Sequence, residues 1–124
     1  MTTYRLAVVG GGNMGAALVG GLLHSGWAAA DLAVVEVLTA RADQLREMLP
    51  GVTVVDETPP CEAALIAVKP YDVAAACGAA ANAGATRLLS IAAGIAIAAL
   101  QDAAGPEVAV VRAMPNTPAL VGQG

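Results

Sequence analysis

The chain has 124 residues, which is enough for one compact domain but not comfortably for two. Charged residues make up 13% and hydrophobic residues 57% of the sequence, which excludes a disordered, solvated chain. The formal net charge of −4 leaves no basic patch for a phosphate backbone, so we expect no nucleic acid partner.

Short apolar runs alternate with helical segments along the chain. Apolar runs bounded by glycine or polar residues predict strands at 4–9, 31–37, 52–55, 63–68, 88–91 and 108–112. Helical patterns predict helices at 13–25, 39–48, 71–83 and 97–101, with Thr39 as the N-cap of the second. This alternation predicts an α/β fold with a doubly wound, mainly parallel sheet in three layers.

The apolar run at 6–23 resembles a targeting segment, since Arg5 precedes it and three alanines follow at 28–30. Glycines between positions 10 and 15 interrupt this run, and it has only one positive charge before it. The stretch at 73–100 is interrupted well before the length of about 20 residues that a membrane span requires. We therefore expect no membrane element and a cytoplasmic protein.

Cysteine and histidine do not form a metal-binding pattern. Cys61 and Cys77 lack CxxC spacing, and His24 is the single histidine of the sequence. We expect both cysteines to be reduced thiols that pack as small apolar residues, with a single disulfide as the alternative. His24 is expected to interact with the last turn of a helix.

A glycine-rich motif follows the first predicted strand. Gly10, Gly12 and Gly15 match G-x-G-x-x-G between a strand and a helix. The first glycine permits a tight turn, the second lets a pyrophosphate approach, and the third lets the helix pack on the strand. Free N–H groups at the helix N-terminus favour phosphate binding. The motif predicts a Rossmann-type dinucleotide-binding domain, and a turn required only for packing is the alternative.

The sequence leaves the choice between NADP and NAD open. Glu36 ends the second predicted strand, where a carboxylate would hydrogen-bond the ribose hydroxyls of NAD and repel the extra phosphate of NADP. Arg41, one turn into the next helix, could instead meet that phosphate if Glu36 turned away. A solvated arginine paired with nearby carboxylates explains Arg41 at least equally well.

No nucleophile–base pair can be assembled from the sequence, and no catalytic residue is assigned. Lys69, Ser90, Asn116 and Thr117 offer hydrogen-bond donors at the carboxyl edge of the predicted sheet. Hydride transfer suits this inventory, because the nicotinamide supplies the chemistry and the protein mainly binds and orients.

Four segments, taken in chain order, resemble pyrroline-5-carboxylate reductase. They are GGGNMGAAL at 10–18, AVKP at 67–70, SIAAGI at 90–95 and VVRAMPNTPALVGQG at 110–124. The resemblance implies reduction of 1-pyrroline-5-carboxylate to proline, the last step of proline biosynthesis, with hydride from NADPH or NADH. It also implies that residues 1–124 are the NAD(P)-binding domain, and that a carboxy-terminal helical dimerisation domain should follow. The isolated chain would then be inactive, and we expect a homo-oligomer.

The resemblance also assigns cofactor contacts by position. Gly12, Asn13 and Met14 would cradle the pyrophosphate. The far side of the crevice would be lined by Ala67, Val68, Lys69 and Pro70. The nicotinamide end of the cofactor site would be lined by Ala92, Ala93, Gly94, Met114, Pro115, Asn116 and Thr117. Asp56 stands where the family tends to carry an asparagine near the ribose phosphate, which leaves the preference between NADPH and NADH open.

Two alternative functions remain. The chain could be a stand-alone dinucleotide-binding or regulatory module, or part of a related imine or β-hydroxyacid-type oxidoreductase, since a shared fold alone does not separate such enzymes. The Ala- and Leu-rich edge near residues 110–121 is expected to be exposed and to promote self-association.

Overall fold

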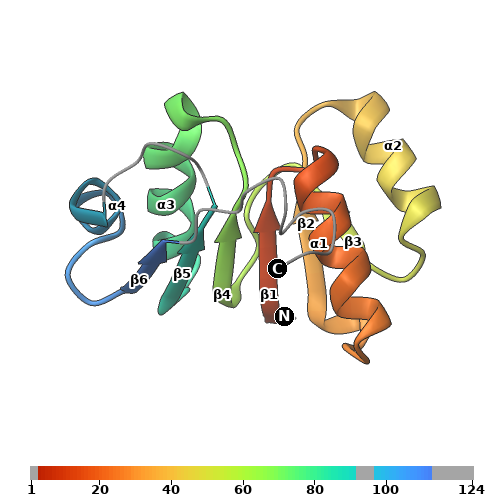
Figure 1. Cartoon of the computed structure of the whole chain (residues 1–124), viewed down its shortest axis with the longest axis horizontal. Helices are drawn as coiled ribbons and strands as arrows, with labels where there is room; N and C mark the ends of the chain where they lie inside the picture. The colour runs from red at the N-terminus through yellow and green to blue at the C-terminus, as the bar shows by residue number, and fades with distance from the viewer. Residues whose placement is uncertain (1–2, 92–96, 113–124) are drawn as a thin grey trace, which may run out of the picture.

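The computed structural model describes residues 3–91 and 97–112, which build a six-stranded sheet with helices on both faces (Figure 1). The strands are β1 (Tyr4–Val9), β2 (Leu32–Val35), β3 (Thr53–Val55), β4 (Cys61–Ile66), β5 (Arg87–Ser90) and β6 (Ala109–Arg112). The helices are α1 (Asn13–His24), α2 (Thr39–Met48), α3 (Val73–Asn82) and α4 (Ile97–Ala104). Two short 3₁₀ turns, η1 (Ala29–Asp31) and η2 (Pro70–Asp72), precede β2 and α3.

The strand order is β3-β2-β1-β4-β5-β6, and every pair of neighbouring strands is parallel. This order is that of a doubly wound dinucleotide-binding fold. The predicted α/β class and the parallel sheet are therefore confirmed.

Alternating side chains of β1 enter two separate cores. Ala7 and Val9 pack with residues of α3 and α4, whereas Val8 packs with residues of α1 and α2. Successive residues of a strand point to opposite faces, so each face of the sheet carries its own helix layer. Figure 1 shows α1 and α2 over the β1–β3 half, and α3 and α4 over the β4–β6 half. The predicted three layers are confirmed.

Two strands that lead to the site end earlier than predicted. β4 covers 61–66 rather than 63–68, because its ladder with β1 stops at the pair Val9–Ile66, where β1 turns away. Ala67 and Val68 therefore lie in a loop. β2 ends at Val35 rather than at 37, although the Glu36 N–H still donates to the Val55 carbonyl at 2.8 Å.

Three helix predictions also need correction. The helix predicted at 71–83 is divided into η2 and α3, and the one predicted at 97–101 continues to Ala104. Thr39 is the first helical residue of α2 rather than its N-cap. Leu38 occupies the N-cap position, without a side-chain capping hydrogen bond, because its backbone is the last extended one before the helix.

Both cysteines are free and buried in the core on the α3 side of the sheet. Burial raises the pKa of the Cys61 and Cys77 thiols. This confirms the prediction of free thiols that pack as apolar residues. No group of three or more potential metal ligands occurs among residues 3–91 and 97–112.

The apolar run at 6–23 forms most of β1, the glycine-rich turn and most of α1. His24 is the last residue of that helix. Within the part of the chain that the structure describes, no helix is long and apolar enough to cross a membrane.

Candidate dinucleotide-binding site

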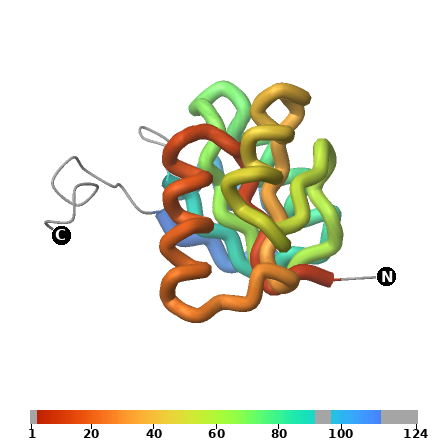
Figure 2. The backbone as a smooth tube through the Cα atoms, turned by 90° about the vertical axis from the view of Figure 1, so that its right-hand side faces the viewer, coloured from red at the N-terminus to blue at the C-terminus, as the bar shows by residue number. Residues whose placement is uncertain are grey.

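The candidate site lies where the strand order reverses, between β1 and β4. In open parallel sheets, ligands bind outside the carboxyl ends of the strands at such a switch point. The Gly10 N–H donates to the Val35 carbonyl at 3.0 Å, and the Ala67 N–H donates to the Val9 carbonyl at 2.8 Å. These bonds hold the turn after β1 and the loop after β4 against neighbouring strands. Figure 2 shows the chain turns after β1, β2 and β4 gathered at one end of the molecule.

Gly10 lies directly against the loop that follows β4. Its φ of +115° is a conformation that residues with a side chain rarely adopt. A Cβ on Gly10 would lie 2.5 Å from the Ala67 carbonyl oxygen and 3.2 Å from the Val68 nitrogen. Glycine is therefore required here both by the backbone conformation and by the neighbouring loop.

The other two motif glycines differ in what surrounds them. A Cβ on Gly15 would collide with the Gly10 carbonyl oxygen, so this glycine serves the packing of α1 on the turn. A Cβ on Gly12 would meet no atom within 4 Å, and its φ of −71° suits any residue. Neither packing nor backbone conformation explains Gly12, whereas a ligand that approaches the turn closely would.

The N-terminus of α1 opens beside Gly12, which is its N-cap. No side chain caps this end, and the first turn carries no acidic residue. The Ala16 N–H is already paired with the Gly12 carbonyl at 2.9 Å, whereas the N–H groups of Asn13, Met14 and Gly15 precede the first intrahelical bond. Such an uncapped helix start can receive an anionic group such as a phosphate.

Glu36, which directly follows β2, and Arg41 of α2 both reach the glycine-rich turn. One carboxylate oxygen of Glu36 accepts the Gly11 N–H at 3.2 Å, and the other accepts the Leu38 N–H at 3.0 Å. Arg41 Nε donates to the Gly11 carbonyl at 2.6 Å, and Nη1 donates to Gln44 Oε1 at 3.0 Å. Among the described contacts, Arg41 thus bonds main chain and an amide rather than the carboxylates considered from the sequence.

Gly11 belongs to this site although it lies outside the G-x-G-x-x-G positions. A Cβ on Gly11 would come 2.6 Å from Leu45 Cδ1 and 2.7 Å from Glu36 Oε1, so a side chain here would displace one of these two side-chain ends. The run of three glycines was a signal for it in the sequence. The role of Gly11 could not be predicted from the sequence, because it depends on contacts with Glu36 and Arg41, which lie 25 and 30 positions away.

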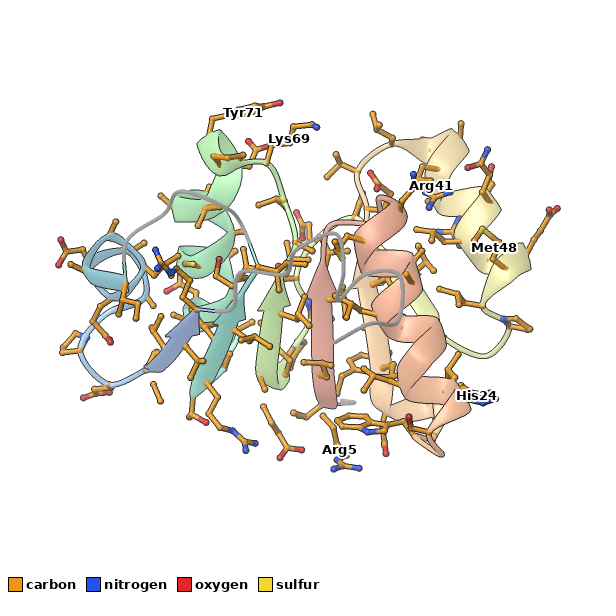
Figure 3. The ribbon with its side chains drawn as sticks, in the orientation of Figure 1. Arg5, His24, Arg41, Met48, Lys69 and Tyr71 are labelled. Atoms are coloured by element: carbon orange, nitrogen blue, oxygen red, sulfur yellow. The ribbon has the colours of Figure 1, made fainter. Side chains whose placement is uncertain are left out.

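The loop after β4 contributes the remaining predicted residues that the structure describes. Ala67 and Val68 are half-buried, whereas Lys69 and Pro70 are exposed. Tyr71 follows with 79% of its surface exposed. Figure 3 shows Lys69 and Tyr71 at the same end of the molecule as Arg41. Ser90, in contrast, is buried at the end of β5.

Asp56 lies beside the Glu36 edge of the sheet, because the residue before it, Val55, accepts the Glu36 N–H at 2.8 Å. Asp56 follows β3 and lines a cavity of about 530 Å³ together with Asn82 and Ala83 at the C-terminal end of α3. The nicotinamide-end residues Ala92, Ala93, Gly94, Met114, Pro115, Asn116 and Thr117 lie outside the described residues.

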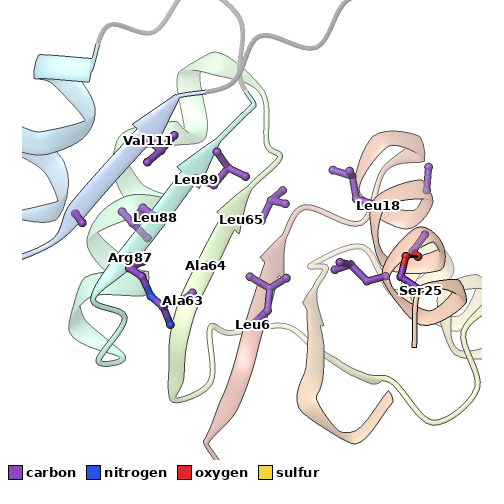
Figure 4. Close-up of a pocket in the computed structure, with 14 residues that line it drawn as sticks. Leu6, Leu18, Ser25, Ala63, Ala64, Leu65, Arg87, Leu88, Leu89 and Val111 are labelled. Carbon is purple, nitrogen blue, oxygen red and sulfur yellow. Dashed lines mark hydrogen bonds between the residues drawn. The ribbon is translucent and has the colours of Figure 1, made fainter. Parts of the chain in front are cut away.

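A second, apolar groove lies on the face of the sheet beside α1 (Figure 4). It has a volume of about 830 Å³ and is lined by Leu18 of α1 and by Leu65, Leu89 and Val111 of β4, β5 and β6. Val111 is 58% exposed, as expected for the edge at 110–121, of which residues 113–121 lie outside the described residues. This groove has few polar groups and does not resemble a phosphate site.

Comparison with known proteins indicates the class of enzyme. Residues 5–94 match the family model described as "NADP oxidoreductase coenzyme F420-dependent". The chain is 41% identical to the pyrroline-5-carboxylate reductase of Mycobacterium leprae over 97% of its own length and 44% of that protein's length. The resemblance seen in the sequence is thereby confirmed. The chain spans somewhat under half the length of the curated relatives it matches.

Solved structures agree with this relationship. The pyrroline-5-carboxylate reductase of Coxiella burnetii superposes with a TM-score of 0.83 at 26% identity, covering 97% of this chain and 47% of that one. The pyrroline carboxylate reductase of Plasmodium falciparum, with NADP bound, superposes with a TM-score of 0.72 at 25% identity, covering 98% and 46%.

Proposed function

This chain belongs to the family "NADP oxidoreductase coenzyme F420-dependent", and from that premise we propose that it is the cofactor-binding domain of a pyrroline-5-carboxylate reductase. The observation that carries the proposal is the open space at Gly12 beside the uncapped start of α1. A pyrophosphate placed there would meet the N–H groups of Asn13 and Met14, and no protein atom lies within 4 Å of the position of a Gly12 Cβ. Residues 1–124 then form the dinucleotide-binding domain, and the substrate pocket is completed by protein beyond it.

The proposed reaction reduces the C=N bond of 1-pyrroline-5-carboxylate to give proline. A bound NADPH or NADH supplies the hydride that adds to the imine carbon, while the nitrogen takes up a proton. The residues of this chain bind the cofactor and orient it. Gly12, Asn13 and Met14 hold the pyrophosphate, and the loop Ala67–Pro70 lines the opposite wall of the crevice.

NADP is the cofactor that we propose first. The family description and the NADP-bound reductase of Plasmodium falciparum support this choice. NADH remains the second candidate, because it contains the same pyrophosphate that the start of α1 would receive.

The binding site is tested by calorimetric titration of the chain with NADPH and, separately, NADH. Gly12→Val would place two methyl groups in the open space, so we expect it to remove binding while the circular dichroism spectrum stays unchanged. Gly20→Ala in α1 is the matched control, since a Cβ there also meets no atom within 4 Å. Equal affinity of Gly12→Val and the unsubstituted chain would contradict the proposed site.

The enzymatic part of the proposal requires the longer protein. Proline formation from 1-pyrroline-5-carboxylate by the full-length parent, but not by residues 1–124 alone, is the expected result. A full-length parent that binds NADPH but is inert toward this substrate would favour a related imine or β-hydroxyacid-type reductase.

We further propose that the protein is a cytoplasmic homo-oligomer. The free, buried cysteines support a reducing compartment. The apolar groove beside α1 supports association, because exposed apolar surface of this kind tends to be covered by a partner. Val111→Lys should shift the isolated chain toward monomer in sedimentation velocity runs over a range of concentrations. A profile that is monomeric at every concentration before substitution would contradict self-association.

A further inference from the structure

We propose that Glu36 and Arg41 are positioning residues, which together fix the Gly11 peptide and hold the glycine-rich turn in the form that receives a pyrophosphate. This inference rests on the proposed function, because it assigns a role within the same cofactor site. It differs from the sequence-based expectation, in which Glu36 contacts the ribose and selects between NAD and NADP.

Gly11 is held on both of its main-chain groups. Glu36 accepts the Gly11 N–H at 3.2 Å, and Arg41 Nε donates to the Gly11 carbonyl at 2.6 Å. Both bonds are part-buried, and each involves an ionised side chain, which strengthens a hydrogen bond. Glu36 lies in the loop directly after β2 and Arg41 lies in α2, so the turn is tied to both.

The Glu36 carboxylate has little freedom to leave this position. Its second oxygen accepts the Leu38 N–H at 3.0 Å, at the N-cap of α2. The positive end of the α2 dipole also favours a negative charge there. A rotation of the carboxylate toward a ribose would break main-chain hydrogen bonds at Gly11 and Leu38.

A side chain at Gly11 would crowd two side chains of this site. The Leu45 side chain, fully buried, lies beneath the position that a Gly11 Cβ would occupy, and Glu36 lies beside it. Gly12, the next residue, faces open space. A fixed peptide at Gly11 therefore sets the direction in which Gly12 and the start of α1 present their N–H groups.

A positioning role predicts a pattern of affinities that a ribose-contacting role does not. If Glu36 selects between cofactors, removing its charge should favour NADPH over NADH. If Glu36 and Arg41 hold the turn, both cofactors should lose affinity together, because both contain the same pyrophosphate.

The first test measures the turn without any cofactor. Amide hydrogen exchange, resolved by NMR, is compared for the unsubstituted chain, Glu36→Ala and Glu36→Gln. We expect Glu36→Ala to speed exchange of the Gly11 and Leu38 amides about tenfold or more, with Glu36→Gln intermediate because one acceptor oxygen remains. The Gly10 amide, bonded to the Val35 carbonyl, is the internal reference and should not change.

The second test measures calorimetric affinity for NADPH and NADH. Glu36→Ala and Arg41→Ala should each weaken both cofactors about tenfold, with the ratio of the two affinities preserved within about threefold. Asp43→Asn is the control, since Asp43 is an exposed carboxylate of α2 that pairs with Arg46. It should change neither affinity.

The outcomes separate this inference from the proposed function. Unchanged Gly11 exchange in Glu36→Ala, or a loss confined to NADH, would overturn the role of Glu36. A loss confined to NADPH in Arg41→Ala would overturn the role of Arg41. If the unsubstituted chain binds neither cofactor, the proposed function fails in this chain, while the exchange measurement still decides whether the Gly11 peptide is held by Glu36.

Discussion

A methyl group on Gly10 would lie 2.5 Å from the carbonyl oxygen of Ala67, so the turn after β1 and the loop after β4 are in direct contact. This contact lies at the switch point of the sheet, where the two halves of the fold diverge. The candidate crevice for a ligand therefore begins where these two main-chain segments meet.

Gly10→Ala should destabilise the fold. The substitution combines a positive φ with overpacking against main chain, so we expect the free energy of unfolding to fall by about 2 kcal/mol or more. Urea unfolding monitored by the single tryptophan, Trp27, measures this change. The control Gly20→Ala should be neutral or stabilise α1 by up to about 1 kcal/mol. Equal stability of the two variants would contradict the proposed contact.

Leu45→Ala should lower the free energy of unfolding. Leu45 is fully buried on α2, so we expect a loss of about 2–5 kcal/mol in the free energy of unfolding. Met48→Ala on the same helix removes a side chain that is 56% exposed and should change stability by no more than about 0.5 kcal/mol. Differential unfolding in urea compares the two variants, and similar losses would argue against the assigned core.

Stability should fall as pH rises above the ordinary thiol value of 9.0. Burial raises the pKa of Cys61 and Cys77 in the folded chain, so the unfolded chain loses the thiol protons first. The contribution is fully present below pH 9.0 and is lost as pH rises through the folded pKa. Each thiol contributes a slope of up to about 1.4 kcal/mol per pH unit.

Urea unfolding at several pH values between neutral and alkaline, in the presence of reductant, tests this dependence. The double variant Cys61→Ala, Cys77→Ala should be less stable at neutral pH because two buried groups are truncated, but its stability should vary less with alkaline pH. The same pH dependence in both proteins would show that the thiols are not its source.

Arg5→Ala should have a small but measurable effect at the opposite end of the sheet. The guanidinium carbon of Arg5 lies 4.5 Å from the centre of the Trp27 ring, and a nitrogen lies 3.7 Å from the Asp31 carboxylate. We expect a loss of about 0.5–1 kcal/mol and a shift of the tryptophan emission. Asp31→Asn removes only the exposed ion pair and should cost less than about 0.5 kcal/mol, without that emission shift.

Much of the architecture could be predicted from the sequence because its signals are local. Buried parallel strands appear as short apolar runs, and helices alternate with them, so the order of elements and the α/β class were correct. The glycine motif placed a turn between β1 and α1 for the same reason. The ends of strands were harder to predict. β4 ends at Ile66 because its partner β1 ends at Val9, so the end of the strand depends on pairing with a distant segment.

The sequence by itself determined which residues are glycine at the turn, which runs are apolar, and which family the chain resembles. Only the tertiary structure decided what each glycine does, because Gly10 meets Ala67, Gly15 meets Gly10, and Gly12 meets open space. It also decided that Glu36 and Arg41 bond the Gly11 peptide. Contacts between residues this far apart depend on how β2 and α2 pack beside β1, and that packing is a property of the whole fold rather than of any local pattern.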